Sequence, residues 1–210
     1  MTKRIRWSAK LAYVVGLIAS DGCLSKDGRH IDFTSKDLDQ VQTFSRLLKL
    51  SNKIGTKGRS KKSGQPYYRV EFGDVNLYRF LLKIGLTPNK SKTIGALLIP
   101  DKYFIDFLRG SFDGDGHSYS YRDPRWRNSF RLYTGFSSAS LKHLEWLQFQ
   151  IERFYNLRGI IKKGTRAFQL EFAKYSSVIL LEKIYYKKGI PFLIRKHSKI
   201  RAALSIISEQ

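Results

Sequence analysis

The chain has 210 residues, of which 42% are hydrophobic, including 14 Phe and 12 Tyr. This content is enough for one large or two small domains with real cores, and it excludes a disordered basic tail. Lys and Arg total 39 against 17 Asp and Glu, a formal net charge of +22. Because charge at this density repels itself unless a polyanion neutralises it, a nucleic-acid partner is favoured over a merely soluble or ribosomal-type basic protein. The basic residues are spread along the chain, which disfavours a membrane partner.

The first twenty residues have the outline of a secretory signal, with basic residues up to Arg6 and an apolar run over 11–19. A similar segment recurs inside the chain at 103–116, where no signal peptide can lie, so we interpret both copies as parts of the folded protein. The single cysteine, Cys23, excludes an internal disulfide and a cysteine-based zinc site. It fits a reducing, intracellular compartment, with cytoplasm and organelle not distinguished.

The chain contains an internal duplication. Four pairs of segments match in the same order: 14–22 with 108–116, 33–38 with 136–141, 70–72 with 170–172, and 90–94 with 196–200. The offsets are all close to half the chain length, which argues against chance. We therefore predict an N-terminal repeat over residues 1–100 and a C-terminal repeat over residues 101–210.

Both repeats have the same expected order of elements. The first has helices over 10–20, 38–50 and 76–84, and hairpins over 23–35 and 54–72 that turn at Asp27-Gly28 and Ser63-Gly64. The second has helices over 103–112, 141–155 and 176–186, and hairpins over 118–137 and 160–172 that turn through 122–128 and at Gly164-Thr165. This αββαββα order predicts an α+β fold with an antiparallel sheet in each repeat.

Alternation along the strands assigns the two faces of each sheet. Ile31, Phe33, Phe130 and Leu132 should face the helices, which turns the polar residues between them outward. A face rich in Arg, Lys, Tyr and Gln could follow a groove of duplex DNA and contact base edges, although many polar strand faces are simply solvated. The same alternation places Glu171 on the outer face. The candidate DNA-binding residues on these faces and the hairpin loops are Arg29, His30, Asp32, Thr34, Arg59, Lys61, Lys62, Arg69, Glu71, Tyr119, Tyr121, Arg122, Arg125, Arg127, Arg131, Tyr133, Lys162, Lys163, Arg166 and Gln169.

Two glycines, Gly16 and Gly110, lie at equivalent positions inside the apolar helices of the two repeats. A helix glycine costs about 1 kcal/mol against alanine, so we expect close helix–helix packing there as compensation. Such packing would bring together the helix ends that carry Asp21 and Asp115. Two carboxylates beside the negative ends of helix dipoles are unfavourable without a cation, which predicts a site for Mg²⁺ that assists phosphodiester cleavage. A plain Asp-Gly turn is the alternative for either copy alone.

The two copies resemble the LAGLIDADG motif, most closely over residues 107–116, FLRGSFDGDG. The resemblance extends over nearly the whole chain, because the segments between the motifs fit the αββαββα repeat of that family. It implies a single-chain, monomeric homing endonuclease with internal pseudo-twofold symmetry. In that family the motif helices form the interface, two sheets form a saddle over a long, nearly palindromic double-stranded DNA site, and the enzyme is usually encoded in an intron or intein. The last motif acids, here Asp21 and Asp115, bind the metal.

The resemblance also implies finer properties of the site. Mg²⁺ or Mn²⁺ would support cleavage, Ca²⁺ would support binding without cleavage, and Ser20 and Gly114 would complete the metal site. Ala19 replaces an earlier motif acid that Asp113 keeps, so we expect the two half-sites to differ chemically. The family's basic and polar residues near the cleft correspond by position to Lys90 or Lys92, Lys196 or Lys199, Ser35 and Ser138, and His117 could orient water.

Two other functions fit the same basic surface. One is a maturase that binds intron RNA, and the other is a noncatalytic DNA-binding regulator of the same fold. Asp21 and Asp115 favour the nuclease, because binding alone gives no reason to juxtapose two carboxylates.

Overall fold

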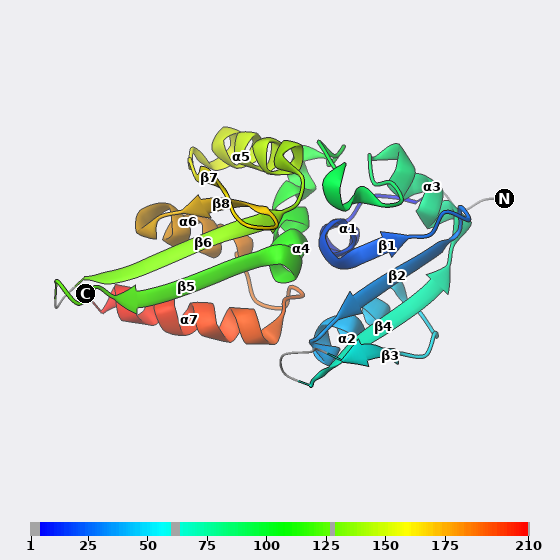
Figure 1. Cartoon of the computed structure of the whole chain (residues 1–210), viewed down its shortest axis with the longest axis horizontal. Coiled ribbons are helices and arrows are strands. Elements are labelled where there is room, and N and C mark those ends of the chain that lie inside the picture. Colours follow the sequence, from blue (N-terminus) through cyan, green and yellow to red (C-terminus); the bar gives the residue numbers. More distant parts are fainter. Residues whose placement is uncertain (1–4, 60–63, 127–128, 210) are drawn as a thin grey trace. The chain divides into compact units, whose positions relative to one another are not determined.

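The computed structural model describes residues 5–59, 64–126 and 129–209, and these residues form two compact units (Figure 1). Unit 1 contains the chain up to Lys90 together with Leu97–Gly114 and Pro191–Leu193. Unit 2 contains Ser91–Ala96, Asp115–Ile190 and the chain from Ile194 onward. The units therefore exchange short segments and do not coincide with the two repeats of the sequence.

Unit 1 is built on a four-stranded antiparallel sheet with the strand order β1-β2-β4-β3. The centre of the sheet pairs β2 with β4, and Phe33 lies opposite Val70. Ile31, Phe33 and Val70 are fully buried toward the helices, as the alternation predicts. The elements of the first repeat are α1 (Ala9–Asp21), β1 (Gly22–Leu24), β2 (His30–Ser35), α2 (Leu38–Leu48), β3 (Gly55–Arg59), β4 (Pro66–Gly73), α3 (Val75–Lys83) and the 3-10 turn η1 (Lys90–Lys92). The 3-10 turn η2 (Asp101–Tyr103) and α4 (Phe104–Asp115) follow.

Helix α1 is apolar on all sides, and its residues from Ala12 to Ala19 are buried, which is typical of a helix inside a core. The Ser8 hydroxyl oxygen accepts a hydrogen bond from the Leu11 amide at 3.1 Å and caps the N-terminus. The helix ends at Asp21, with Gly22 as the C-cap residue. The predicted Asp-Gly helix stop is therefore present.

Unit 2 has a second four-stranded antiparallel sheet, with the equivalent order β5-β6-β8-β7. Helices α5 and α6 pack against β6 and β8, where Leu132, Leu170 and Phe172 are fully buried. The elements are β5 (Gly116–Arg122), β6 (Phe130–Ser138), α5 (Leu141–Tyr155), β7 (Ile160–Lys163), β8 (Phe168–Phe172), α6 (Lys174–Ile184) and α7 (Ile194–Ser208). The predicted α+β class with an αββαββα order in each repeat is confirmed.

Helix α7 is an addition to the expected elements. It runs beside β5, the edge strand of the unit 2 sheet (Figure 1). Lys196 Nζ donates to the Gly116 carbonyl at 2.5 Å, and Lys199 Nζ donates to the Ser118 carbonyl at 2.9 Å. The helix thus covers carbonyl groups that an edge strand would otherwise leave open to another strand. Among the described residues, no helix has the length and apolar character needed to cross a membrane.

Candidate functional site

The two motif helices α1 and α4 touch through their backbones at the paired glycines. A Cβ atom on Gly16 would lie 2.2 Å from the Phe107 carbonyl oxygen, and one on Gly110 would lie 2.1 Å from the Tyr13 carbonyl oxygen. Both distances are far below van der Waals contact, so no larger residue fits without moving a backbone. Close approach of the two helices accounts for glycine at both positions.

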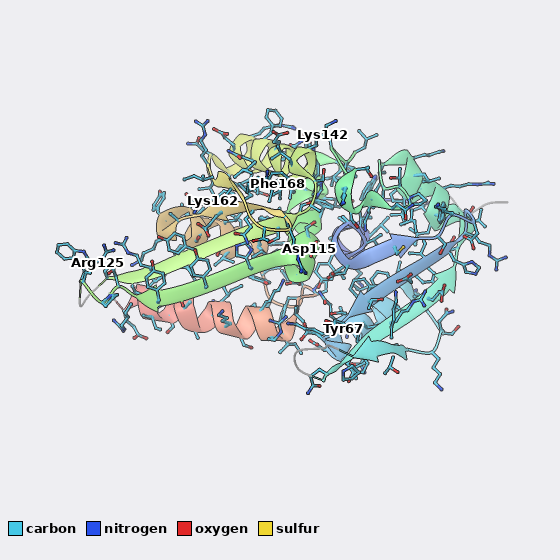
Figure 2. The ribbon with its side chains drawn as sticks, viewed as in Figure 1. Tyr67, Asp115, Arg125, Lys142, Lys162 and Phe168 are labelled. Carbon is cyan, nitrogen blue, oxygen red and sulfur yellow. The ribbon has the colours of Figure 1, made fainter. Side chains whose placement is uncertain are left out.

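The same approach continues to the ends of the helices. A Cβ on Gly114 of α4 would lie 1.9 Å from Ser20 Oγ and 3.0 Å from Asp21 Oδ2, both on α1. Asp115 follows Gly114 as the last residue of α4 and is exposed, whereas Asp21 is half-buried. Figure 2 labels Asp115 where α4 gives way to β5. The last turns of α1 and α4 are therefore in contact, and each helix ends in a carboxylate.

Ser20, one of the expected metal-site residues, uses its hydroxyl proton within α1. Its Oγ lies 3.2 Å from the Gly16 carbonyl oxygen and 3.1 Å from that of Leu17. This bonding back into the helix is common for serine and leaves the hydroxyl oxygen as an acceptor only.

Each repeat places one lysine beside the glycine that follows its motif acid. Lys90 Nζ donates to the Gly22 carbonyl at 2.5 Å, as Lys196 Nζ does to that of Gly116. Lys90 is only 6% exposed, so its ammonium group is held in place. Lys92 is exposed. Of the four lysines considered from the sequence, Lys90 and Lys196 thus occupy equivalent positions.

The earlier acid of the second motif, Asp113, lies in the interior of unit 1 with 1% exposure. Its Oδ2 accepts hydrogen bonds from the Tyr13 hydroxyl at 2.8 Å and from the Leu193 amide at 2.9 Å. The neighbouring Arg109 is fully buried, donates to Asp106 Oδ1 at 2.7 Å and packs over the Tyr13 ring. Asp113 therefore joins a structural network of α1, α4 and the 191–193 segment.

The outer face of the unit 1 sheet is a network of opposite charges. Arg69 Nη2 lies 3.2 Å from Asp32 Oδ2 and 3.0 Å from Glu71 Oε2, and the Thr34 hydroxyl donates to Asp32 at 3.3 Å. Asp32 is consequently 6% exposed although it lies on the outward face. Because the Asp32 carboxylate is covered by Arg69, the side chains on this face that a partner can reach are those of Arg69, Glu71 and Thr34. Nearby, the Asp27 carboxylate accepts from the Arg29 and His30 amides and orders the first hairpin turn.

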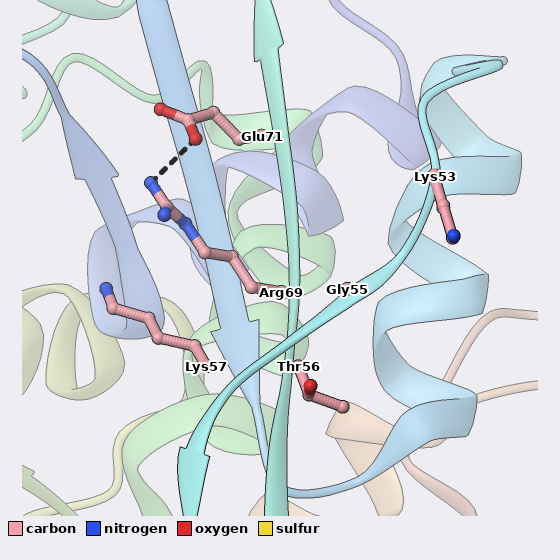
Figure 3. Close-up of a pocket in the computed structure, with 6 residues that line it drawn as sticks. All are labelled: Lys53, Gly55, Thr56, Lys57, Arg69 and Glu71. Carbon is pink, nitrogen blue, oxygen red and sulfur yellow. Dashed lines mark ion pairs between the residues drawn. The ribbon is translucent and has the colours of Figure 1, made fainter.

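A pocket of about 270 Å³ opens beside Arg69 and Glu71, at the edge formed by β3 (Figure 3). Lys53, Gly55, Thr56 and Lys57 complete its lining. The lining thus carries three cationic side chains and one carboxylate, which suits an anionic group such as a backbone phosphate. Lys53 and Lys57 were absent from the expected contacts, although Lys53, Lys57 and Arg59 all fall at alternate positions of the segment, with Gly55 between the first two.

The outer face of the unit 2 sheet is centred on Glu171. Its carboxylate accepts from Lys162 Nζ at 2.6 Å and from the Tyr119 hydroxyl at 2.8 Å. Burial raises the pKa of Glu171, but these two hydrogen bonds outweigh burial, and the net shift is downward. Burial, and then the bond to Glu171, raise the pKa of Tyr119 to about 12. Burial also lowers the pKa of the nearby His117 imidazole, which favours the neutral ring at neutral pH.

The remaining candidates lie at exposed or half-exposed positions of strands and loops, or in the part of the chain that the structure does not describe. Arg29, Arg122, Arg125, Lys163, Arg166 and Gln169 are exposed, and Arg131 is half-exposed. Arg125 is tied to Asp123, with Nη2 to Oδ2 at 2.9 Å and Nε to Oδ1 at 3.0 Å. Lys61, Lys62 and Arg127 lie outside the described residues, as does the side chain of Arg59.

Comparison with known proteins agrees with this architecture. Residues 8–85 match the family described as LAGLIDADG-like domain. No curated protein matches the chain. Among solved structures, the LAGLIDADG meganuclease I-AabMI bound to uncleaved DNA is 13% identical with a TM-score of 0.63, over 92% of this chain and 88% of that one. The homing endonuclease I-WcaI bound to its DNA recognition sequence is 13% identical with a TM-score of 0.64, over 90% and 88% of the two chains.

Full-length DUF199/WhiA from Thermatoga maritima has a similar fold, with 18% identity and a TM-score of 0.61. The similarity covers 98% of this chain but only 62% of that protein. The sheets, the paired motif helices and these likenesses define a two-repeat LAGLIDADG fold. Within the first repeat, residues 8–85 carry the match to the LAGLIDADG-like domain.

Proposed function

We propose that this chain is a site-specific endonuclease that uses a divalent metal to cut both strands of a long, pseudo-palindromic DNA target. The observation that carries the proposal is the contact between the last turns of α1 and α4, where Gly114 lies against Ser20 and Asp21. Each of these helices ends in a carboxylate at the negative end of its dipole. Such an arrangement is costly in a protein that only binds DNA, and a cation makes it favourable.

The groups at the helix ends fit Mg²⁺ or Mn²⁺. The donors are carboxylate and carbonyl oxygens, which are the ligands that these cations prefer. Among the described residues, no group of three or more His, Cys, Asp or Glu side chains gathers to hold a metal ion. Asp21 and Asp115 would then be the protein's carboxylate ligands, and DNA phosphate and water would complete the shell. A bound cation would supply positive charge at the scissile phosphate.

Lys90 and Lys196 would act beside the two acids. Each ammonium group is fixed one residue beyond a motif acid by its bond to a glycine carbonyl. An ammonium group held there can stabilise negative charge that develops on a phosphate oxygen. Because the two lysines occupy equivalent positions in the two repeats, each strand of the DNA duplex would meet its own ammonium group.

The outward sheet faces would bind the duplex as a saddle, with the pseudo-twofold halves each covering one half-site. The net charge of +22 and the cationic side chains along the strands and loops support this role. Similar folds in I-AabMI and I-WcaI have been solved with DNA bound. Homing of the intron that encodes the protein would be the biological outcome.

The test is a cleavage selection from a randomised duplex library, followed by linearisation of a plasmid that carries the selected site. We expect cleavage with Mg²⁺ or Mn²⁺ and binding without cleavage with Ca²⁺. Asp21→Asn and Asp115→Asn should abolish double-strand cleavage but keep DNA binding, whereas Glu145→Gln, at an exposed position on α5, should change neither. Normal cutting by either Asp variant contradicts the site. Binding without cutting by the wild type favours a regulator, and preference for structured intron RNA favours a maturase.

A further inference from the structure

Three tyrosines form a stacked row on the outer face of the unit 2 sheet. The rings of Tyr119 and Tyr133 lie 5.1 Å apart with an interplanar angle of 16°, and those of Tyr121 and Tyr133 lie 6.3 Å apart at 11°. Tyr119 and Tyr133 are direct partners across β5 and β6, and Tyr121 is two residues further along β5. Tyr119 and Tyr121 are 40% and 45% exposed. We call this set the tyrosine row.

The tyrosine row is distinct from the core of unit 2. Leu132, between Arg131 and Tyr133 on β6, is fully buried on the opposite face of the sheet. The row instead leaves large apolar ring edges in water, which proteins seldom do over several neighbouring residues without a binding purpose. On the outer face of the unit 1 sheet, the corresponding centre is the ion network of Asp32, Arg69 and Glu71. The two sheets therefore offer different chemistry to a partner.

The stacking decides which part of each ring is available. Because the rings cover one another's faces, a nucleobase has no free ring face between them on which to stack. The Tyr119 hydroxyl is also engaged, since it donates to Glu171. What remains exposed is the ring edges of Tyr119 and Tyr121, flanked by Arg131 as the cross-strand partner of Tyr121 and by Lys162, which is bound to Glu171.

The spacing of the tyrosine row fits duplex DNA. Alternate residues of an antiparallel strand are about 6.8 Å apart, at roughly 3.4 Å per residue. Successive phosphates of one DNA strand rise about 3.4 Å along the helix axis, so Tyr119 and Tyr121 would stand two base pairs apart. The major groove admits a two-stranded ribbon such as β5–β6, and the apolar group that bases present there is the thymine 5-methyl. The flanking cations suit the phosphates beside such a site.

We infer that the tyrosine row recognises 5-methyl groups of thymine in the half-site bound by unit 2, at positions two base pairs apart. This inference rests on the proposed binding of duplex DNA. It makes unit 2 a reader of apolar methyl groups and unit 1 a reader of polar base edges. The bound target should therefore be chemically asymmetric even where its sequence is nearly palindromic.

The experiment uses the full chain and a duplex selected for binding, with Ca²⁺ present so that no strand is cut. Each thymine of the duplex is replaced in turn by deoxyuridine, which removes only the 5-methyl group, and the Kd is measured for each duplex. We expect a loss of about fourfold in affinity at each of two thymines that are two base pairs apart, as for one buried methyl group. Thymines elsewhere should respond by less than twofold.

Variants connect this effect to the tyrosine row. Tyr121→Ser should remove the response at one of the two thymines, whereas Tyr121→Phe should keep it because the ring remains. Tyr67→Ser, which removes an exposed tyrosine on the outer face of the unit 1 sheet, is the matched control and should keep both responses. General damage to the fold would weaken binding to the thymine and uracil duplexes equally, so the loss of discrimination is specific to the contact.

Two kinds of result overturn the inference. Duplex binding that is unaffected by every uracil substitution, or discrimination that persists at both thymines in Tyr121→Ser, contradicts methyl recognition while leaving the proposed endonuclease intact. Failure to select any duplex, or tighter binding to unpaired RNA than to duplex DNA, removes the proposed function and the inference with it.

Discussion

The Tyr13 hydroxyl donates a hydrogen bond to Asp113 Oδ2 at 2.8 Å, inside unit 1. The two residues belong to α1 and α4, so a motif acid of the second repeat is bound to the motif helix of the first. This gives the two acids of the second motif different roles. Asp113 is buried in the structural network, whereas Asp115 is exposed at the end of α4 and is the acid that we propose as a metal ligand.

The first prediction concerns Asp113. Asp113→Ala leaves the Tyr13 hydroxyl and the Leu193 amide without this acceptor in a buried place, and we expect the free energy of unfolding to fall by about 3 kcal/mol. Tyr13→Phe should lower it by about 1.5 kcal/mol, and the double variant by less than the sum. Urea denaturation measures all three. If Asp113→Asn is as stable as the wild type but cannot cut DNA, Asp113 is catalytic and our assignment is wrong.

The second prediction tests the contact of the motif helices. Gly110→Ala places a methyl group 2.1 Å from the Tyr13 carbonyl oxygen, and a backbone atom cannot move aside as a side chain would. The better helix propensity of alanine offsets about 1 kcal/mol of the clash. We expect a net loss of about 2 kcal/mol in the free energy of unfolding. Gly95→Ala meets no atom within 4 Å and should stay within about 0.5 kcal/mol of the wild type.

The third prediction separates the two lysines of η1. Lys90→Met removes the ammonium group held beside Gly22, and we expect cleavage to slow by about 10²-fold at saturating DNA. Lys92→Met, at the other end of the same turn, removes an exposed charge and should leave the rate within about twofold while weakening binding slightly. Single-turnover kinetics on a selected site provide the measurement. Equal effects of the two substitutions on the rate would show that the lysines contribute only through overall charge.

The fourth prediction concerns pH and the β5–β6 loop. Hydrogen bonds from the Arg125 side chain, opposed by burial, lower the pKa of Asp123 to about 2 from the ordinary value of 3.8. A carboxyl group whose pKa is lower in the folded state contributes stability above its unfolded pKa and loses it as the pH falls through the folded pKa. The stability difference between the wild type and Asp123→Asn should therefore be constant above about pH 5 and shrink between about pH 4 and pH 2. Urea denaturation across this range measures it, and a difference that does not change with pH contradicts the assignment.

Much of the fold follows from local patterns in the sequence. The alternation of Ile31 and Phe33 predicts their burial because side chains on a strand point to opposite faces with a period of two. Paired glycines in apolar helices predict close helix contact because few other roles offset their cost. Helix α7 was missed, although Ile200, Ala203, Leu204 and Ile207 have helical spacing, because residues 196–200 were matched to the short segment 90–94 of the first repeat.

Other features depend on tertiary contacts that no local pattern contains. The burial of Asp32 follows from its pairing with Arg69, which is 37 residues away. The alternation of side chains along the strand places Asp32 on the outward face, but only the fold shows that the Arg69 guanidinium covers its carboxylate. The tyrosine row likewise needs the register of β5 on β6, which sets Tyr119 opposite Tyr133. Of the four candidate lysines, the sequence could not choose Lys90 and Lys196, because their partners are carbonyl groups of distant strands.

The interleaving of the two units has a consequence for dividing the protein. The backbone passes from one unit to the other at five peptide bonds: after Lys90, Ala96, Gly114, Ile190 and Leu193. A gene split after residue 100 would deprive the first fragment of α4 and the second of the partner helix that covers Gly110. Neither fragment would possess a complete core, so the duplicated halves have become mutually dependent for folding and are no longer separable modules.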